Sequence, residues 1–200
     1  MTPRPDVSEE RREQIIAAAM AVFARLGFHE SRMDDIAEES GLSKGAIYWY
    51  FKSKDDIIAA IMDRFIGREI EGLEAALKLQ APASEKLLQL SSMFVEEMRS
   101  MIDMMPILYE FYAVATRKKS VRKALMRYFQ PTRKLLGALI QQGVDAGEFA
   151  PVDADAVAID LIAFYEGLLL LAVLDPRTVD LDNMGKSGIS LIVEGLKRMS

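Results

Sequence analysis

The chain has 200 residues, half of them hydrophobic, and a formal net charge of −5. This length supports one or two domains with real cores, and the hydrophobic content excludes a disordered protein. There is no cysteine and only one histidine, which excludes disulfides, thiolate metal sites and a cysteine nucleophile. We expect no bound metal and no cofactor. The polar N-terminus is not a signal peptide, and together with the lack of cysteine it indicates a cytoplasmic protein.

Every predicted element is a helix, so the expected fold class is all-α, and the first helix runs from about Ser8 to Leu26. Ser8 can cap this helix, and Gly27 can end it. Apolar residues at helical spacing form a stripe along it: Ile15, Ile16, Ala19, Val22 and Phe23. The helix therefore has one face suited to a core.

The next stretch predicts two short helices joined by a tight turn, and then the start of a third helix. Ser31 can cap the first, and Gly41 supplies the left-handed residue that ends it. Ser43 can cap the second helix, residues 44–50, and Ser53 can cap the third. Helix, glycine turn and helix form a helix-turn-helix pattern.

The second of these helices has the composition of a DNA reader, because no acidic residue lies between Gly41 and Lys54. Its N-terminal end holds residues small or polar enough to approach base edges in a major groove: Ser43, Lys44, Gly45 and Ala46. Three aromatic residues follow one another: Tyr48, Trp49 and Tyr50. Because three consecutive positions of a helix span about 200° around its axis, at least one of these aromatic side chains must face outward.

Residues 11–62 resemble the DNA-binding domain of the TetR (tetracycline repressor-like) family of transcriptional regulators. The pieces that carry the resemblance are residues 15–28, 33–51 and 52–57. It implies a helix-turn-helix domain over residues 1–53 and a helical effector-binding and dimerisation domain over residues 54–200.

The family pattern also implies roles for single residues in DNA binding. It assigns base contacts to Lys44, Gly45 and Ala46, and phosphate contacts to Tyr48 and Lys54, with Trp49 and Tyr50 as further candidates. Arg32 is either another phosphate contact or a solvated arginine. Glycine and alanine offer almost no side chain for hydrogen bonding, so specificity would rest on Lys44, Tyr50 and DNA shape.

The charge of this region is an objection to DNA binding. Residues 1–60 hold eight Lys and Arg against eleven Asp and Glu, a net charge of −3. A DNA-binding module normally shows a basic footprint. The footprint must therefore be local, with the acidic residues turned away from the duplex.

The C-terminal part is predicted to contain a long helix over residues 53–79 and an amphipathic helix over residues 85–105, followed by a helix over residues 107–116. Methionine and aromatic side chains adapt to varied apolar ligands, although at helical spacing they are more often plain core. Glu110 would meet a cationic ligand if buried, and would otherwise be solvated or paired. The candidate ligand residues are Met93, Met101, Met105, Leu108, Tyr109, Glu110, Tyr112, Phe164 and Tyr165.

Two predicted helices near the C-terminus, residues 153–174 and 188–199, are strongly apolar. Asp160 and Glu166 interrupt the first, so we expect a buried or interfacial helix rather than a membrane span. Two such helices favour a four-helix interface between two copies, and a homodimer suits a palindromic DNA site. Before them, the basic run from Arg117 to Lys134 is either a solvated helix face or an attraction for distant phosphates.

The sequence thus predicts a homodimeric, ligand-responsive transcriptional repressor that binds a double-stranded DNA operator and is released by a small molecule. An apolar or cationic-apolar effector is favoured over a sugar or phosphate, and a fatty acyl effector is left open. An enzyme is disfavoured because no nucleophile, base or metal ligands converge in the pattern. The remaining alternative is a helical ligand-binding or interaction protein without specific DNA binding.

Overall fold

The computed structural model describes residues 7–117 and 119–197, and within them the chain forms helices and no strand, which confirms the all-α prediction. The polar N-terminal residues 1–6 lie outside the described part. The first four helices are α1 (Val7–Leu26), α2 (Met33–Ser40), α3 (Lys44–Tyr50) and α4 (Lys54–Lys78). They are followed by α5 (Ala83–Ser100), a 3-10 turn η1 (Ile102–Met104), α6 (Met105–Ala115), α7 (Lys119–Asp145), α8 (Ala154–Leu174) and α9 (Leu181–Leu196).

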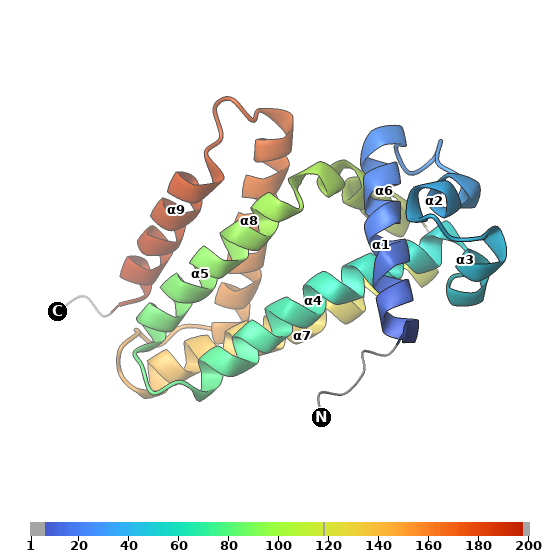
Figure 1. Ribbon diagram of the computed structural model, residues 1–200. Helices are drawn as coiled ribbons and strands as arrows, with labels where there is room; N and C mark the ends of the chain where they lie inside the picture. Colours follow the sequence, from blue (N-terminus) through green and yellow to red (C-terminus); the bar gives the residue numbers. More distant parts are fainter. Residues whose placement is uncertain (1–6, 118, 198–200) are drawn as a thin grey trace.

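Helices α1 to α3 form a compact unit at one end of the molecule (Figure 1). Gly41 adopts φ 67° and ends α2 as predicted, because glycine has no Cβ to clash in this conformation. The predicted cap of α2 is wrong by one residue. The Ser31 hydroxyl donates to the Phe28 carbonyl (2.9 Å), and the Asp35 carboxylate instead accepts from the Arg32 N–H (2.7 Å).

The long helix α4 connects this unit to the rest of the chain and packs along α7 (Figure 1). The Ser53 hydroxyl caps it as predicted by accepting from the Asp56 N–H (3.2 Å). The first turns of α4 lie in the same core as α1 to α3, and Met104 and Ile107 from η1 and α6 join that core. The N-terminal unit therefore completes its core with residues from the larger domain.

The remaining helices form the larger domain, in which α5 packs on α9 and α7 on α8. Helix α7 continues through Pro131 as one helix, although a proline inside a helix lacks the N–H that would donate to the preceding turn. The last helix begins at Leu181 instead of residue 188, because the Asp180 carboxylate accepts from the Asp182 and Asn183 N–H groups and starts it earlier. Helix α8 is long and apolar enough to cross a membrane by length and composition, and 33% of its most apolar 18-residue stretch is buried, where it packs against α7 and α9.

Candidate DNA-binding surface and ligand cavity

Helix α3 lies at the outer edge of the N-terminal unit, away from the larger domain (Figure 1). Its inner side is fixed by Ile47, which is fully buried, and by Phe51 just after the helix. The Ser43 hydroxyl accepts from the Ala46 N–H (3.2 Å), which confirms Ser43 as the cap. Because one side of α3 is buried, its opposite side remains accessible to a binding partner.

The predicted DNA-contacting residues of α3 mostly lie on that open side. Tyr48 and Trp49 are 39% and 68% exposed, which agrees with the expectation that an aromatic must face outward. Ser43, Lys44 and Gly45 are also exposed, whereas Ala46 and Tyr50 are half-buried. Arg32, at the start of α2, is exposed as well.

The lysines of this surface differ in how freely they could reach DNA. The Lys44 ammonium lies 2.7 Å from the Asp34 carboxylate, and this hydrogen-bonded pair raises the pKa of Lys44. The Lys52 ammonium donates to the Tyr48 carbonyl (2.7 Å). Lys44 would therefore have to exchange its carboxylate partner for a phosphate or a base.

Lys54, a predicted phosphate contact, lies against the loop between α1 and α2. Its ammonium donates to the carbonyl groups of Phe28 and Ser31, and lies 4.6 Å from the centre of the Phe28 ring. Loss of hydration in this position lowers the pKa of Lys54. The side chain thus holds the loop between α1 and α2, because it satisfies carbonyls that no helix hydrogen bond reaches.

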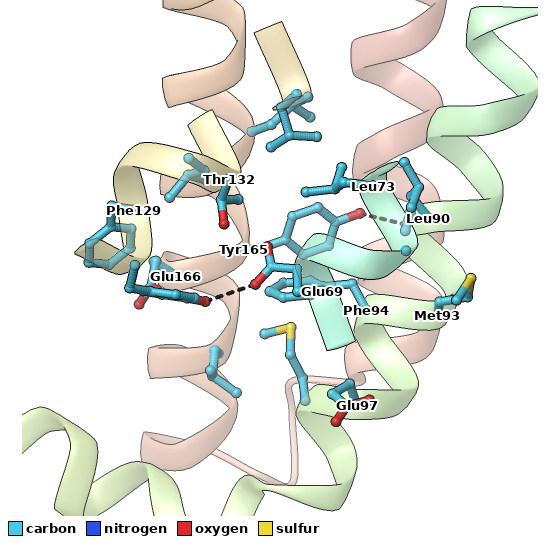
Figure 2. Close-up of a pocket in the computed structure, with 18 of the residues that line it drawn as sticks. Glu69, Leu73, Leu90, Met93, Phe94, Glu97, Phe129, Thr132, Tyr165 and Glu166 are labelled. Carbon is cyan, nitrogen blue, oxygen red and sulfur yellow. Dashed lines mark hydrogen bonds between the residues drawn. The ribbon is translucent and has the colours of Figure 1, made fainter. Parts of the chain in front are cut away.

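The larger domain contains a partly open cavity of about 530 Å³ between α4, α5, α6, α7 and α8 (Figure 2). Its wall is mostly aliphatic, aromatic and methionine side chains. Six of the predicted ligand residues line it: Met93, Met101, Met105, Leu108, Tyr112 and Tyr165. The methionine-rich pattern therefore identified much of the cavity wall.

Three predicted ligand residues do not line the cavity. Glu110 turns toward the N-terminal unit, where its Oε2 lies 3.4 Å from His29 Nε2. The Phe164 ring packs against α9, since a Cβ at Gly188 would come within 2.0 Å of it. Tyr109 packs edge-on against Tyr112, with ring centroids 5.9 Å apart. The helix positions were right, but the sequence did not show which face looks inward.

Four carboxyl groups that the sequence did not assign to the cavity line it, those of Glu69, Glu71, Glu97 and Glu166, and two of them are hydrogen-bonded to tyrosines. Glu69 from α4 accepts a hydrogen bond from the Tyr128 hydroxyl (3.1 Å), and Glu166 from α8 accepts one from the Tyr112 hydroxyl (3.1 Å). Burial raises the pKa of Glu69 from 4.5 to about 7, with a smaller opposing effect of the Tyr128 hydrogen bond. Burial also raises the pKa of Glu166. A carboxylate inside a nearly apolar helix was the available signal for Glu166.

Three further polar groups lie in the cavity wall. The Tyr165 hydroxyl and the Ser91 hydroxyl are hydrogen-bonded (2.5 Å). Thr132 is only 3% exposed, and its hydroxyl lies near enough to Glu69 to oppose the rise in the pKa of that carboxyl group. Figure 2 shows the Thr132 oxygen directed into the cavity, on the side where Glu69 projects.

Elsewhere the structure offers little that resembles a reactive centre. Among the described residues, no group of three or more His, Cys, Asp or Glu side chains could hold a metal ion. Within the basic run, Arg122, Lys123 and Arg127 are exposed on α7, and Arg133 forms an ion pair with Asp155.

An exposed helix of a helix-turn-helix, joined by one long helix to a domain that contains an apolar cavity, defines the class of ligand-responsive transcriptional regulators. The family model described as "Bacterial regulatory proteins, tetR family" matches residues 15–61, and the one described as "BetI-type transcriptional repressor, C-terminal" matches residues 83–187. The chain belongs to the TetR family of transcriptional regulators, which confirms the resemblance seen in the sequence.

Relatives are similar over nearly the whole chain. An uncharacterised helix-turn-helix transcriptional regulator, YfiR of Bacillus subtilis, is 29% identical over 185 residues, which cover 90% of this chain and 88% of YfiR. A regulator from Saccharomonospora viridis in complex with choline has a TM-score of 0.78 at 25% identity, covering 96% of this chain and all of that one. The regulator FadR of Bacillus subtilis in complex with stearoyl-CoA has a TM-score of 0.76 at 25% identity, covering 92% and 98%.

Proposed function

We propose that this protein is a homodimeric, cytoplasmic transcriptional repressor that binds a palindromic operator and is released by a small molecule in the cavity. The observation that carries the proposal is the combination in one chain of an exposed α3 and a partly open cavity, with α4 contributing to both units. A ligand that changes the position of α4 would then change the position of α3.

We infer that α3 enters the major groove with its N-terminal end toward the base edges. Ser43, Lys44 and Gly45 are exposed there, so the backbone can approach closely. Tyr48 and Trp49 lie on the same open side and can reach the phosphate backbone or bases. Lys54 serves the loop fold instead.

The homodimer is inferred from apolar side chains that α8 and α9 leave exposed. These side chains are Ile159, Leu170, Leu171 and Leu174 on α8 and Met184 and Leu191 on α9. Helix α9 lies at the end of the molecule opposite α3 (Figure 1). Pairing of two copies through this face would cover the patch and direct both α3 helices to successive grooves roughly 34–36 Å apart.

The dimer has its own test. Leu191 is 72% exposed, so Leu191→Glu leaves the monomer fold intact but places a charge in the proposed interface. We expect a dimer for the wild type and a monomer for the variant in sedimentation velocity, with Leu79→Glu, a change at an exposed leucine after α4, as the control. A wild-type monomer would refute the homodimer.

The effector is inferred to be apolar or cationic-apolar. The cavity is mainly apolar and has the volume of a small-molecule site. The two structural relatives bind ligands of different chemistry, choline in one and stearoyl-CoA in the other. Relatives therefore support a small-molecule effector without fixing its charge.

The decisive experiment selects bound fragments from random DNA with the purified full-length protein. We expect the wild type to enrich an inverted repeat, and Lys44→Ala to weaken binding to it by about 1–3 kcal/mol. Lys134→Ala, an exposed lysine on α7, is the matched control and should bind as the wild type does.

If the wild type enriches no DNA at low salt, it should be denatured, refolded to remove co-purified ligand, and tested again. Continued failure would refute the repressor and favour a helical ligand-binding protein without specific DNA binding. Loss of enrichment in Lys134→Ala as well would show that general charge, not α3, holds the DNA.

A further inference from the structure

Glu69 and Glu166 face the same apolar cavity from two different helices, α4 and α8. The charge of Glu166 adds to the effect of burial in raising the pKa of Glu69. Among the described side chains that line the cavity, none is a lysine, arginine or histidine. The described side chains of the cavity wall therefore include acidic groups but no basic group.

Each of these carboxyl groups keeps capacity to bind a ligand. A carboxylate offers about four acceptor positions, and the hydrogen bonds from Tyr128 to Glu69 and from Tyr112 to Glu166 occupy one on each. Thr132 adds a buried hydroxyl that is directed into the cavity on the side of Glu69 (Figure 2).

Aromatic rings stand around the two carboxyl groups. Phe129 packs against Tyr128 with centroids 4.7 Å apart and against Tyr112 with centroids 6.2 Å apart. All three rings line the cavity. Aromatic faces attract organic cations, and the attraction grows when the cation is removed from water.

We propose that the cavity binds an amphiphilic organic monocation. Its charge lies between Glu69 and Glu166, and its apolar part contacts the methionine side chains of the cavity wall. The apolar part would contact Met93, Met101 and Met105, which adapt to chains and rings alike. A fatty acid would instead bring a third carboxylate beside two others, and repulsion would oppose it. The inference rests on the proposed function only in taking this cavity as the effector site.

Binding of such a cation is coupled to proton release from Glu69. Near neutral pH a large share of Glu69 carries a proton, because its pKa is about 7. A cation favours the ionised carboxylate, so the proton passes to the buffer when the ligand binds. Among the described side chains, the titratable groups that face Glu69 are Glu97 from α5, Tyr112 from α6, Tyr128 from α7 and Glu166 from α8.

The sign of the pH dependence follows from this exchange. Below about pH 7 the cation must displace a proton, and above it the carboxylate is already ionised. Affinity for a permanently charged cation should therefore rise by up to roughly tenfold per pH unit from pH 5.5 to 7 and level off above pH 7.5.

The test is calorimetric titration of the full-length protein, without DNA, with three ligands that share a ten-carbon chain: decyltrimethylammonium, decanoate and 1-decanol. We expect the cation to bind at least roughly tenfold more tightly than the other two. Glu69→Gln and Glu166→Gln should each weaken cation binding by roughly tenfold or more, and Glu69→Gln should also flatten the pH dependence. Glu74→Gln, the same change at an exposed position of α4 outside the cavity wall, is the control.

Equal or tighter binding of decanoate or 1-decanol would overturn the proposal, as would binding of none of the three or unchanged cation binding in both glutamine variants. If one variant fails to fold, the other variant and the wild-type pH series still decide. A protein that selects DNA fragments but shows no preference for the cation would refute this inference alone. One that prefers the cation but selects no DNA would refute the repressor and leave the cation site standing.

Discussion

Glu69→Gln should make the protein more stable at alkaline pH, even though it removes a proposed ligand contact. Burial raises the pKa of Glu69 to about 7 in the folded protein, from 4.5 for an ordinary carboxyl group. Since the folded state holds this proton more tightly than the unfolded chain, stability falls as pH rises through that interval, and the loss is complete above pH 7. At about 1.36 kcal/mol per pH unit, the loss amounts to about 3 kcal/mol at pH 8.

Glutamine keeps the shape and the acceptor for the Tyr128 hydroxyl but has no charge to desolvate. We expect the variant to exceed the wild type by about 2–3 kcal/mol in free energy of unfolding at pH 8, and by less than about 0.5 kcal/mol at pH 4.5. Urea unfolding followed by circular dichroism at fixed protein concentration measures both.

The exposed Glu74→Gln should change stability little at either pH. An equal stability difference for Glu69→Gln at pH 4.5 and pH 8, or a destabilised variant at pH 8, would contradict this expectation. Either result would mean that Glu69 is not buried as an uncompensated carboxylate.

Four other changes probe local packing and capping. Gly143→Ala should cost about 1–3 kcal/mol, because the new Cβ would lie 2.3 Å from the buried Phe149 ring, whereas Gly67→Ala has open space and should raise the melting temperature. Ser43→Ala should cost about 1 kcal/mol through loss of the α3 cap, and an unchanged melting temperature would contradict that capping role. Lys54→Met should destabilise the fold by about 1–3 kcal/mol but leave the salt dependence of DNA binding unchanged, and a lower salt slope would instead identify Lys54 as a phosphate contact.

Local chemistry made the N-terminal unit predictable from sequence. Gly41 must take a conformation that other residues avoid, and Ser43 and Ser53 supply cap oxygens to N–H groups three residues ahead. These interactions span a few residues, so they are readable without the fold. Ser31 was wrongly predicted to cap α2. Its hydroxyl donates to the Phe28 carbonyl, and the Asp35 carboxylate, from inside the helix, accepts from the Arg32 N–H at the start of α2.

The cavity was predictable only in part. Methionine and aromatic spacing predicted helices rich in adaptable apolar residues, and six of nine predicted ligand residues line the cavity. Spacing alone does not tell which face of a helix looks inward when both faces are apolar. Tyr109, Glu110 and Phe164 were misplaced for that reason, and Glu110 meets His29 instead.

The sequence by itself thus determined the helices, the helix-turn-helix and the family, because each depends on neighbours along the chain. The tertiary structure alone decided that Glu69 and Glu166 share one cavity and that the Lys54 ammonium lies on the carbonyls of a preceding loop. These groups are far apart in sequence, and no periodicity records which helices pack together. Their altered proton affinities arise from burial, which exists only once the helices have assembled.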